Sequence, residues 1–259
     1  MLSLPELLEA YPVALRVHRS FILREYLQCK ILEILFETPF ANRFCFLGGT
    51  CLRLVHNNSR FSEDLDFDNF QVTESEFGEV SESIRAGLEQ QGYQVEMKQV
   101  IRGAYHCYIR FPGLLFEQGI SGYREEKILI QLDTEPQHFD FQPESYILNQ
   151  FDVTTQILTT PLPILLAQKF TALCQRKRSK GRDFFDIVFL LSKSVKPDYS
   201  FLELKLGVSN RDQLMEQVRD LCQHLDMEEM VKDVRNFLFF PADEKKIRLF
   251  LPLLEQSDF

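Results

Sequence analysis

The chain of 259 residues contains no tryptophan, and none of its six cysteines belongs to a Cys-x-x-Cys pair. Its five histidines are scattered as well, so no cluster of cysteine and histidine has the spacing of a zinc site. These absences argue against a zinc-binding domain. We expect the cysteines to be reduced, buried thiols, and we attach no functional meaning to the missing tryptophan.

Long hydrophobic runs and an excess of positive charge are missing too. No window reaches the 18 or more apolar residues that a membrane span needs, and the N-terminus has early acidic residues in place of a signal-peptide pattern. The sequence thus predicts a soluble, cytoplasmic protein without a membrane partner. Its net charge of -9 argues against a protein coated in nucleic acid but leaves room for a local basic patch.

Hydrophobic residues make up 45% of the sequence, which is enough to bury a sizeable core. Helical spacing predicts a long amphipathic helix over 13–37, and the pattern becomes entirely helical after Pro161. Alternating segments between them predict strands. We expect an α/β fold with N-terminal helices and a helical C-terminal region, divided as 1–155 and 156–259. The predicted strands are 43–47, part of 60–70, 93–100, 104–111 and 127–133, and the further helices are 50–57, 74–91, 162–178, 183–192, 211–224, 227–238 and 242–255.

A short apolar strand ending at Leu47 runs into two glycines, Gly48 and Gly49, and then Thr50. Glycines let a backbone approach a phosphate closely, and the free N–H groups at the start of the following helix favour an anion. Thr50 adds a hydroxyl at this helix start. Taken alone, a Gly-Gly pair is most often an ordinary turn.

An Asp-x-Asp pair follows about fourteen residues later. Because residues i and i+2 of a strand point to the same face, Asp64 and Asp66 place two carboxylates side by side, while Leu65 and Phe67 point into the core. Adjacent carboxylates repel one another unless a cation lies between them, and hard oxygen ligands select Mg²⁺ or Mn²⁺. An isolated Asp-x-Asp is usually a solvated strand edge or loop, but after the glycines it predicts a phosphoryl-transfer site.

The stretch GGTCLRLVHNNSRFSEDLDF, residues 48–67, resembles the signature of the AbiEii/AbiGii nucleotidyltransferase toxins. It contains the GGT-x-L-x-(K/R) and RFSEDLDF elements of that family with little departure. The resemblance implies the fold of the polymerase-β-like nucleotidyltransferase superfamily, with a mixed sheet, and an NTP as substrate. It also implies the glycine motif's role in this chain: Gly48, Gly49 and Thr50 hold the triphosphate, while Asp64 and Asp66 are the metal ligands.

Arg60 and Ser62 match the family motif just before the aspartates, and the resemblance counts both as nucleotide-binding. Arg60 either neutralises phosphate charge or forms a structural ion pair, and the sequence leaves both alternatives open. A third carboxylate is expected on a neighbouring strand, where a base near the attacking hydroxyl would help. Asp133, which closes the apolar strand 128–132, is the candidate, although a carboxylate at a strand end is ordinary. Asp68 is a weaker competitor.

A basic run lies between two predicted helices, since five of the seven residues 176–182 are Lys or Arg. The ordinary explanation is a solvated helix end, and Asp183 alone has the position of an N-cap. The AbiEii-type toxins carry a helical lysine followed by a basic loop that ends in Arg-Asp. The resemblance therefore implies that Lys169 contacts the nucleotide phosphates during catalysis, and that Arg182 and Asp183 complete the site. The remaining cations of the run are predicted to bind RNA: Arg176, Lys177, Arg178 and Lys180.

The predicted reaction is attack by an acceptor hydroxyl on the α-phosphate of an NTP, with release of pyrophosphate. The resemblance suggests a tRNA 3′ end as acceptor and a cognate antitoxin as protein partner. Two alternatives stay open: a nucleotidyltransferase acting on a protein or small-molecule hydroxyl, and a catalytically degenerate binding module. The basic run favours RNA, and the intact Asp-x-Asp argues against degeneracy.

Overall fold

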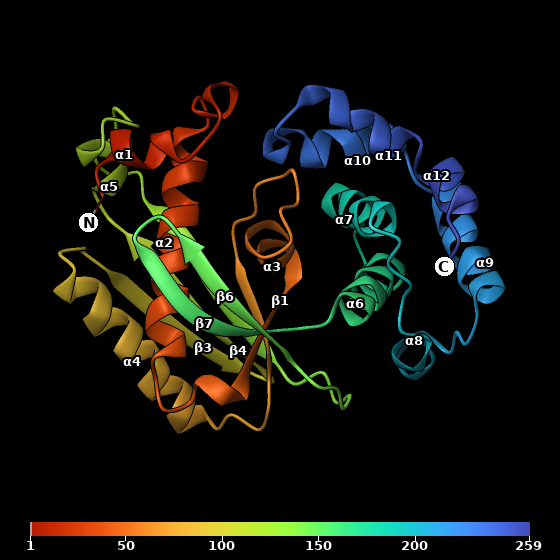
Figure 1. Ribbon diagram of the computed structural model, residues 1–259, viewed down its shortest axis with the longest axis horizontal. Coiled ribbons are helices and arrows are strands. Elements are labelled where there is room, and N and C mark those ends of the chain that lie inside the picture. Colours follow the sequence, from red (N-terminus) through yellow and green to blue (C-terminus); the bar gives the residue numbers. More distant parts are fainter. Residues whose placement is uncertain (1) are drawn as a thin grey trace. The chain divides into compact units, whose positions relative to one another are not determined.

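The computed structural model describes residues 2–259, which form two compact units (Figure 1). Unit 1 contains the chain up to His56 together with Ser62–Thr159, and unit 2 contains Asn57–Phe61 together with Thr160–Phe259. The division after Thr159 lies close to the one that we predict from sequence. No local pattern indicated that Asn57–Phe61 belongs to unit 2, so the chain enters this unit briefly and returns to unit 1.

Unit 1 is built around one seven-stranded sheet with the order β3-β4-β5-β2-β1-β7-β6. The β1–β7 and β2–β5 pairs are parallel, and the other neighbours are antiparallel. This mixed sheet with its flanking helices confirms the predicted α/β class. The strands are β1 Phe44–Leu47, β2 Leu65–Asn69, β3 Glu96–Arg102, β4 Ala104–Phe111, β5 Ile128–Glu135, β6 Glu144–Gln150 and β7 Val153–Thr159.

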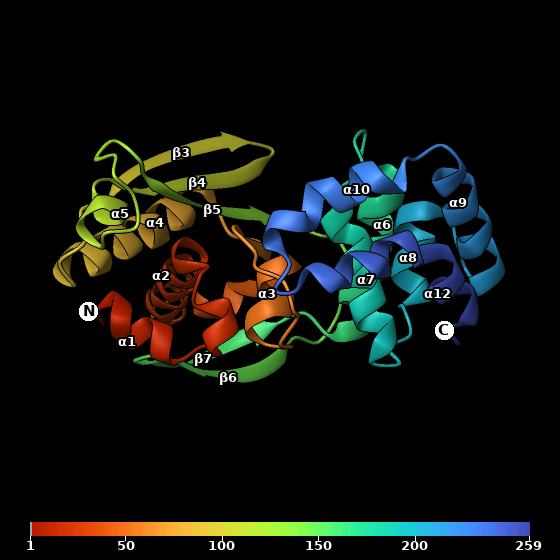
Figure 2. The ribbon, with the colours of Figure 1, turned by 90° about the horizontal axis from the view of Figure 1, so that it is seen from above.

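The helices of unit 1 are α1 Leu4–Glu9, α2 Arg19–Phe36, α3 Gly48–Leu54, α4 Glu74–Gln90 and α5 Leu114–Glu117. Helices α2, α3 and α4 contact strands of the sheet, and α1 packs on α2. The sheet curves around α2, which contacts β5 and β7, while α4 contacts β3 and β4 (Figures 1 and 2). Along β5, Ile130 and Leu132 are buried and the intervening Gln131 and Asp133 are partly exposed. Alternation thus leaves polar side chains on the opposite face of the sheet.

Two sequence predictions for unit 1 need correction. The helix predicted over 13–37 begins only at Arg19, because Val13–Leu15 forms a separate 3-10 turn after Pro12. Val13 is 78% exposed and therefore does not continue the buried stripe of α2. The β6–β7 hairpin was missed altogether. Its edge strand β6 has three consecutive apolar residues at its centre and is largely exposed, so it lacks the alternation that reveals a strand.

Unit 2 is a bundle of helices in which α7 is central. Its helices are α6 Leu162–Gln175, α7 Gly181–Ser192, α8 Tyr199–Leu206, α9 Arg211–Gln223, α10 Met227–Val234, α11 Lys245–Arg248 and α12 Phe250–Gln256, with 3-10 turns at Arg235–Phe237 and Pro241–Glu244. Helix α7 contacts α6, α10, α11 and α12. The sequence did not predict α8.

None of the helices within residues 2–259 has the length and apolar character needed to cross a bilayer.

The short segment Asn57–Phe61 is fastened to unit 2 by its backbone. The Phe61 N–H donates to the Phe237 carbonyl at 2.8 Å, and the Phe239 N–H donates to the Ser59 carbonyl at 3.2 Å. Arg60 and Leu238 thereby form an isolated antiparallel bridge. This pairing holds the first two residues of the RFSEDLDF element in unit 2, whereas its aspartates belong to unit 1.

Candidate active site

The Asp-x-Asp pair lies at the start of β2, on the face of the sheet away from α2. Leu65 and Phe67 are buried at 0% and 2% exposure, and Asp64 and Asp66 alternate with them as partly exposed side chains. The parallel β2–β5 register pairs Asp66 with Asp133. Laterally paired residues of neighbouring strands share a face of the sheet, so the structure brings the candidate third carboxylate beside the Asp-x-Asp pair.

Asp133 is held by two side chains of its own sheet. His106 Nδ1 lies 2.7 Å from Asp133 Oδ1, and Gln131 Nε2 donates to the same carboxylate at 2.8 and 2.9 Å. His106 reaches this position because the antiparallel β4–β5 register pairs it with Asp133. Sequence analysis missed His106. The only local signal was its place on the polar face of an alternating strand, which many residues share.

Gly48 has a structural role that its sequence context did not reveal. It begins α3 with φ +79°, in the left-handed region that favours glycine. A Cβ at this position would overlap Asp66 Oδ2 and would lie 2.9 Å from Asp66 Cγ. The bare Cα of Gly48 therefore makes the space in which the Asp66 carboxylate lies.

Replacing Gly48 with Ala is therefore expected to displace the Asp66 carboxylate and to reduce nucleotide transfer at least about tenfold, because ligand geometry at a metal site is coupled to rate. Gly92→Ala is the matched control. Gly92 also has a positive φ, +91°, but no atom lies within 4 Å of its added Cβ. Both variants carry a backbone strain of roughly 1–2 kcal/mol, so thermal unfolding should move similarly. Equal transfer rates in the two variants would show that the Asp66 contact is irrelevant.

The other residues of the glycine motif order the backbone around the aspartates. Thr50 is fully buried, and its hydroxyl donates to the Asp64 carbonyl. Gly49 is also buried, as is Ser62. Gln28 of α2 donates from Nε2 to the carbonyls of Ser62, at 3.2 Å, and of Glu63, at 2.9 Å. These bonds fix the segment that leads into Asp64.

Unit 2 contains a buried ionic cluster centred on Asp186 of α7, which is fully buried. Arg60 donates to both of its carboxylate oxygens, from Nε at 2.7 Å and from an Nη at 2.6 Å. Asn58 adds a hydrogen bond of 2.8 Å, and Lys169 Nζ lies 2.8 Å from Asp186 Oδ2. Of the two alternatives for Arg60, the structure contains the ion pair, which binds the Asn57–Phe61 segment to α7.

Lys169 and Asp183, both predicted site residues, belong to the same cluster. Lys169 Nζ is 3.4 Å from Asp183 Oδ1, and Arg176 pairs with the other Asp183 oxygen. Burial on its own would raise the pKa of the Asp186 carboxyl, but Arg60 and Lys169 outweigh burial and lower that pKa to about 2. Sequence analysis missed Asp186. Its signal was a second aspartate three residues after Asp183, in an otherwise apolar helix.

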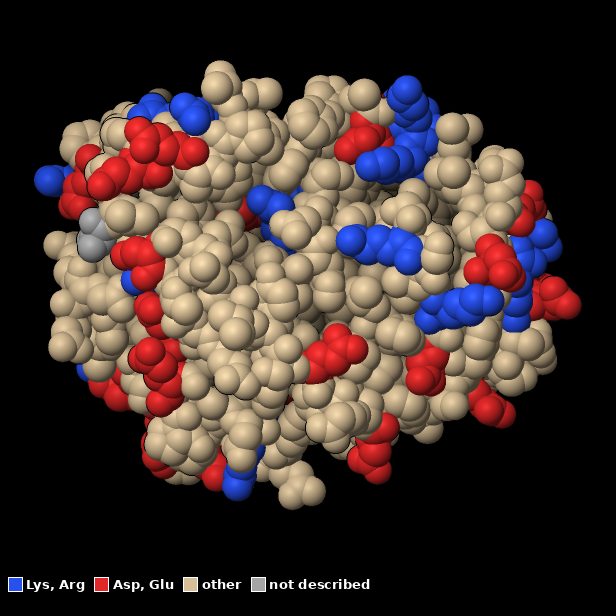
Figure 3. Space-filling view, viewed as in Figure 1, with Lys and Arg blue, Asp and Glu red and all other residues tan. Residues whose placement is uncertain are grey.

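The basic run separates into paired and unpaired cations. Arg176 is paired with Asp183, whereas Lys177 and Arg178 are exposed and form no ion pair within residues 2–259. These two side chains and Lys232 of α10 line a pocket of about 590 Å³. Lys180 and Arg182 likewise have no carboxylate partner in the described chain. On the face shown in Figure 3, acidic side chains form a broken line over unit 1.

The carboxylates of Asp64 and Asp66 fit a metal ion whose other ligands come from substrate phosphates and waters. Within residues 2–259, no three Asp, Glu, His or Cys side chains converge as a ready-made metal-binding group. Mg²⁺, however, is commonly bound by one or two carboxylates together with substrate phosphates and waters. The pair Asp64 and Asp66 has the donor chemistry for that arrangement, and the predicted metal ligands therefore fit a cation that is bound together with a nucleotide.

Together, the mixed sheet and the carboxylate pair beside a glycine-started helix are those of a nucleotidyltransferase. The family model described as "Nucleotidyl transferase AbiEii toxin, Type IV TA system" matches residues 30–257. The chain therefore belongs to the AbiEii family of nucleotidyltransferase toxins, as the resemblance of residues 48–67 indicated. A sequence comparison with curated proteins gives no match.

Solved structures share the fold. MenT4, a nucleotidyltransferase toxin from Mycobacterium tuberculosis H37Rv, is 17% identical with a TM-score of 0.59, over 100% of this chain and 91% of that chain. JHP933 from Helicobacter pylori is 15% identical with a TM-score of 0.56, over 92% of each chain. At these low sequence identities, the similarity shows that this chain shares its fold with the two structures.

Proposed function

We propose that the protein transfers a nucleoside monophosphate from an NTP to the 3′-terminal hydroxyl of a tRNA, and that a cognate antitoxin restrains it. The observation that carries this proposal is the alignment of Asp64, Asp66 and Asp133 on one face of the sheet, beside Gly48. Family membership supports the transfer reaction. The exposed cations Lys177 and Arg178 favour an RNA acceptor over a protein or small-molecule hydroxyl.

The roles of the carboxylates follow from their positions. Asp64 and Asp66 would hold Mg²⁺ or Mn²⁺, which supplies positive charge for the phosphoryl oxygens. Asp133 accepts the proton of the acceptor hydroxyl as its oxygen bonds to the α-phosphorus. The bond from the α-phosphorus to the bridging oxygen breaks, and pyrophosphate leaves. The hydrogen bond with His106 orients the Asp133 carboxylate for this proton transfer.

Roles for Lys169, Arg182 and Asp183 in nucleotide binding remain part of the proposal. In the structure Lys169 forms ion pairs with Asp183 and Asp186, so two carboxylates orient its ammonium group. Gly49, Ser62 and the backbone around Thr50 would contribute by shaping the loop that receives the phosphates.

Incubation of the protein with total tRNA, Mg²⁺ and each labelled NTP in turn tests the function directly. We expect label to appear on tRNA with at least one NTP, and to disappear when a chelator removes the metal, because the paired carboxylates then repel the triphosphate. Label on protein but not on RNA would favour the alternative acceptor. No label with any NTP, in a folded sample, would contradict the proposal.

A second prediction concerns the exposed cations Lys177 and Arg178 as the RNA-binding surface. The double substitution Lys177→Ala with Arg178→Ala should weaken tRNA binding, and should flatten its dependence on salt by about one unit of slope per lost phosphate contact. The double substitution Lys193→Ala with Lys245→Ala removes the same charge from exposed positions of unit 2 outside the pocket. Its salt slope should stay close to that of the wild type. Indistinguishable slopes for the two double variants would exclude this pocket as the RNA surface.

A further inference from the structure

Strand β6 is an edge strand of the sheet of unit 1, and its outer side has no partner strand. The sheet order ends with β1-β7-β6, and Figure 2 shows β6 at the margin of unit 1. Within residues 2–259, no residue of β6 forms a backbone-to-backbone hydrogen bond outside its pair with β7. A free edge of this kind is a surface on which another strand can pair.

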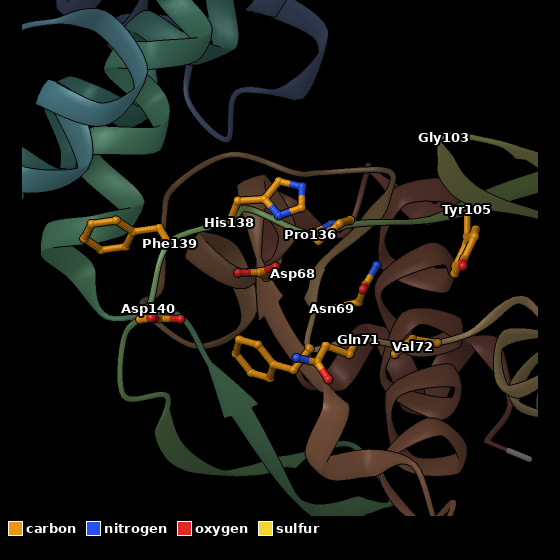
Figure 4. Close-up of a pocket in the computed structure, with 11 residues that line it drawn as sticks. Asp68, Asn69, Gln71, Val72, Gly103, Tyr105, Pro136, His138, Phe139 and Asp140 are labelled. Carbon is orange, nitrogen blue, oxygen red and sulfur yellow. The ribbon is translucent and has the colours of Figure 1, made fainter.

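The loop that leads into β6 leaves this edge open, because it is fastened to the middle of the sheet. Its residues His138, Phe139 and Asp140 line a pocket of about 630 Å³ together with the end of β2 (Figure 4). The Gln137 N–H donates to the Asp68 carboxylate of β2 at 2.9 Å. The loop therefore packs on β2, which β1 and β7 separate from β6.

Strand β6 also lacks the features that normally keep an edge strand from pairing. It contains no Lys, Arg or Pro, and its one charged residue is Glu144 at its start. Its seven residues pair with β7 in consecutive register, without a bulge. At its centre is Ile147, whose side chain is 66% exposed. The opposite edge strand β3 is protected, since Glu96, Lys98 and Arg102 place exposed charges along it.

The β6–β7 hairpin determines which backbone groups of β6 are free. Two residues form the turn after Gln150, so the strand ends that flank this turn make a hydrogen-bonded pair. Hydrogen bonding alternates along an antiparallel pair. The N–H and C=O groups of Ser145, Ile147 and Asn149 consequently point away from β7, and the side chains of these three residues are exposed.

A second copy of this chain fits the free edge. When two copies use the same edge, a two-fold axis relates them and their strands run antiparallel. An axis at Ile147 pairs all seven residues of β6. Ile147 then lies opposite its own copy, Ser145 opposite Asn149, and Glu144 opposite the neutral Gln150. No like charges meet, and the three outward-pointing residues of each strand form about six hydrogen bonds across the axis.

We propose that β6 is an interaction surface on which a second copy of this chain pairs, joining two sheets edge to edge in a symmetric dimer. Each copy contributes one strand, so the interface is small and the dimer should dissociate in the micromolar range. Since β1 and β7 lie between β6 and β2, the surface contains none of the proposed catalytic aspartates. The inference is therefore independent of the proposed function.

Ile147→Cys tests the register of the two strands. In a hydrogen-bonded antiparallel pair the two Cα atoms lie about 5.5 Å apart, which is within the range that a disulfide spans. Under a mild oxidant we expect this variant to form a reducible, covalent dimer at least about tenfold faster than Gln99→Cys. Gln99 is the matched control, because it is the exposed central residue of the other edge strand, β3. Equal rates of cross-linking in the two variants would overturn the proposed pairing.

Ile147→Lys tests the dimer without cross-linking. The residue is exposed, so the variant should fold, and its position on the axis places two like charges directly opposite each other. Sedimentation velocity over a range of micromolar concentrations should show the wild type dimerising, with a Kd at least about tenfold higher in Ile147→Lys. Gln99→Lys should dimerise like the wild type.

Two results of the sedimentation experiment would overturn the proposal. One is a wild-type protein that stays monomeric throughout, and the other is a dimer that Ile147→Lys leaves intact. Nucleotide transfer per chain should be the same in Ile147→Lys and the wild type, because β6 is not part of the proposed active site. If no sample transfers a nucleotide, the proposed function fails, and sedimentation still decides the dimer.

Discussion

Asp66→Asn is expected to lower nucleotide transfer at least about 100-fold while unit 1 stays folded. Asn has nearly the same size as Asp, so the substituted side chain at position 66 still fits beside the bare Cα of Gly48. The substitution removes the negative charge needed to hold a divalent cation with the substrate phosphates. Asp64→Asn should have the same effect, because the two carboxylates act as a pair.

The measurement is the initial rate of label transfer to tRNA, made alongside thermal unfolding. Asp220→Asn is the matched control, since Asp220 is exposed on α9 of unit 2 and far along the chain from the motif. It should transfer at the wild-type rate. Turnover close to wild type in folded Asp64→Asn or Asp66→Asn would remove these residues from the catalytic site.

Asp186→Asn should produce the largest loss of stability, about 3–5 kcal/mol, because it leaves buried cations without their counter-charge. Arg60 is 1% exposed and donates two hydrogen bonds to this carboxylate. Lys169 would keep only the more distant Asp183, at 3.4 Å. Unfolding by urea at neutral pH should show the loss. Glu228→Gln, which breaks an exposed pair with Arg248, should change stability little.

The same carboxylate makes stability depend on pH in a definite direction. The pKa of Asp186 is lowered from 3.8 to about 2 in the folded protein. A depressed pKa gives stabilisation that is present above the unfolded value and is lost as the pH falls through the folded value. The stability difference between wild type and Asp186→Asn should therefore shrink as the pH falls from about 4 to about 2. A constant difference across this range would contradict the ion-pair explanation.

Local sequence determined those features that depend on spacing along the chain. The alternation around Leu65 and Phe67 predicted the shared face of Asp64 and Asp66, because side chains of a strand alternate with period two. Likewise, the helix predicted over 74–91 corresponds closely to α4, Glu74–Gln90, because helical spacing is a local pattern. The resemblance of residues 48–67 then indicated the family that the comparison established.

Tertiary structure alone decided the contacts between residues that are distant in sequence. Asp133 lies beside Asp66 because β5 adds to β2 in parallel, and His106 reaches Asp133 because β4 adds to β5. Similarly, Arg60 meets Asp186 across 126 positions of sequence. Periodicity encodes which side of an element is buried, but the choice of neighbouring strand or helix depends on how the whole core packs. Local pattern and the resemblance thus predicted the paired aspartates and a nucleotidyltransferase. The packed structure decided which groups orient them, and why Gly48 must lack a side chain.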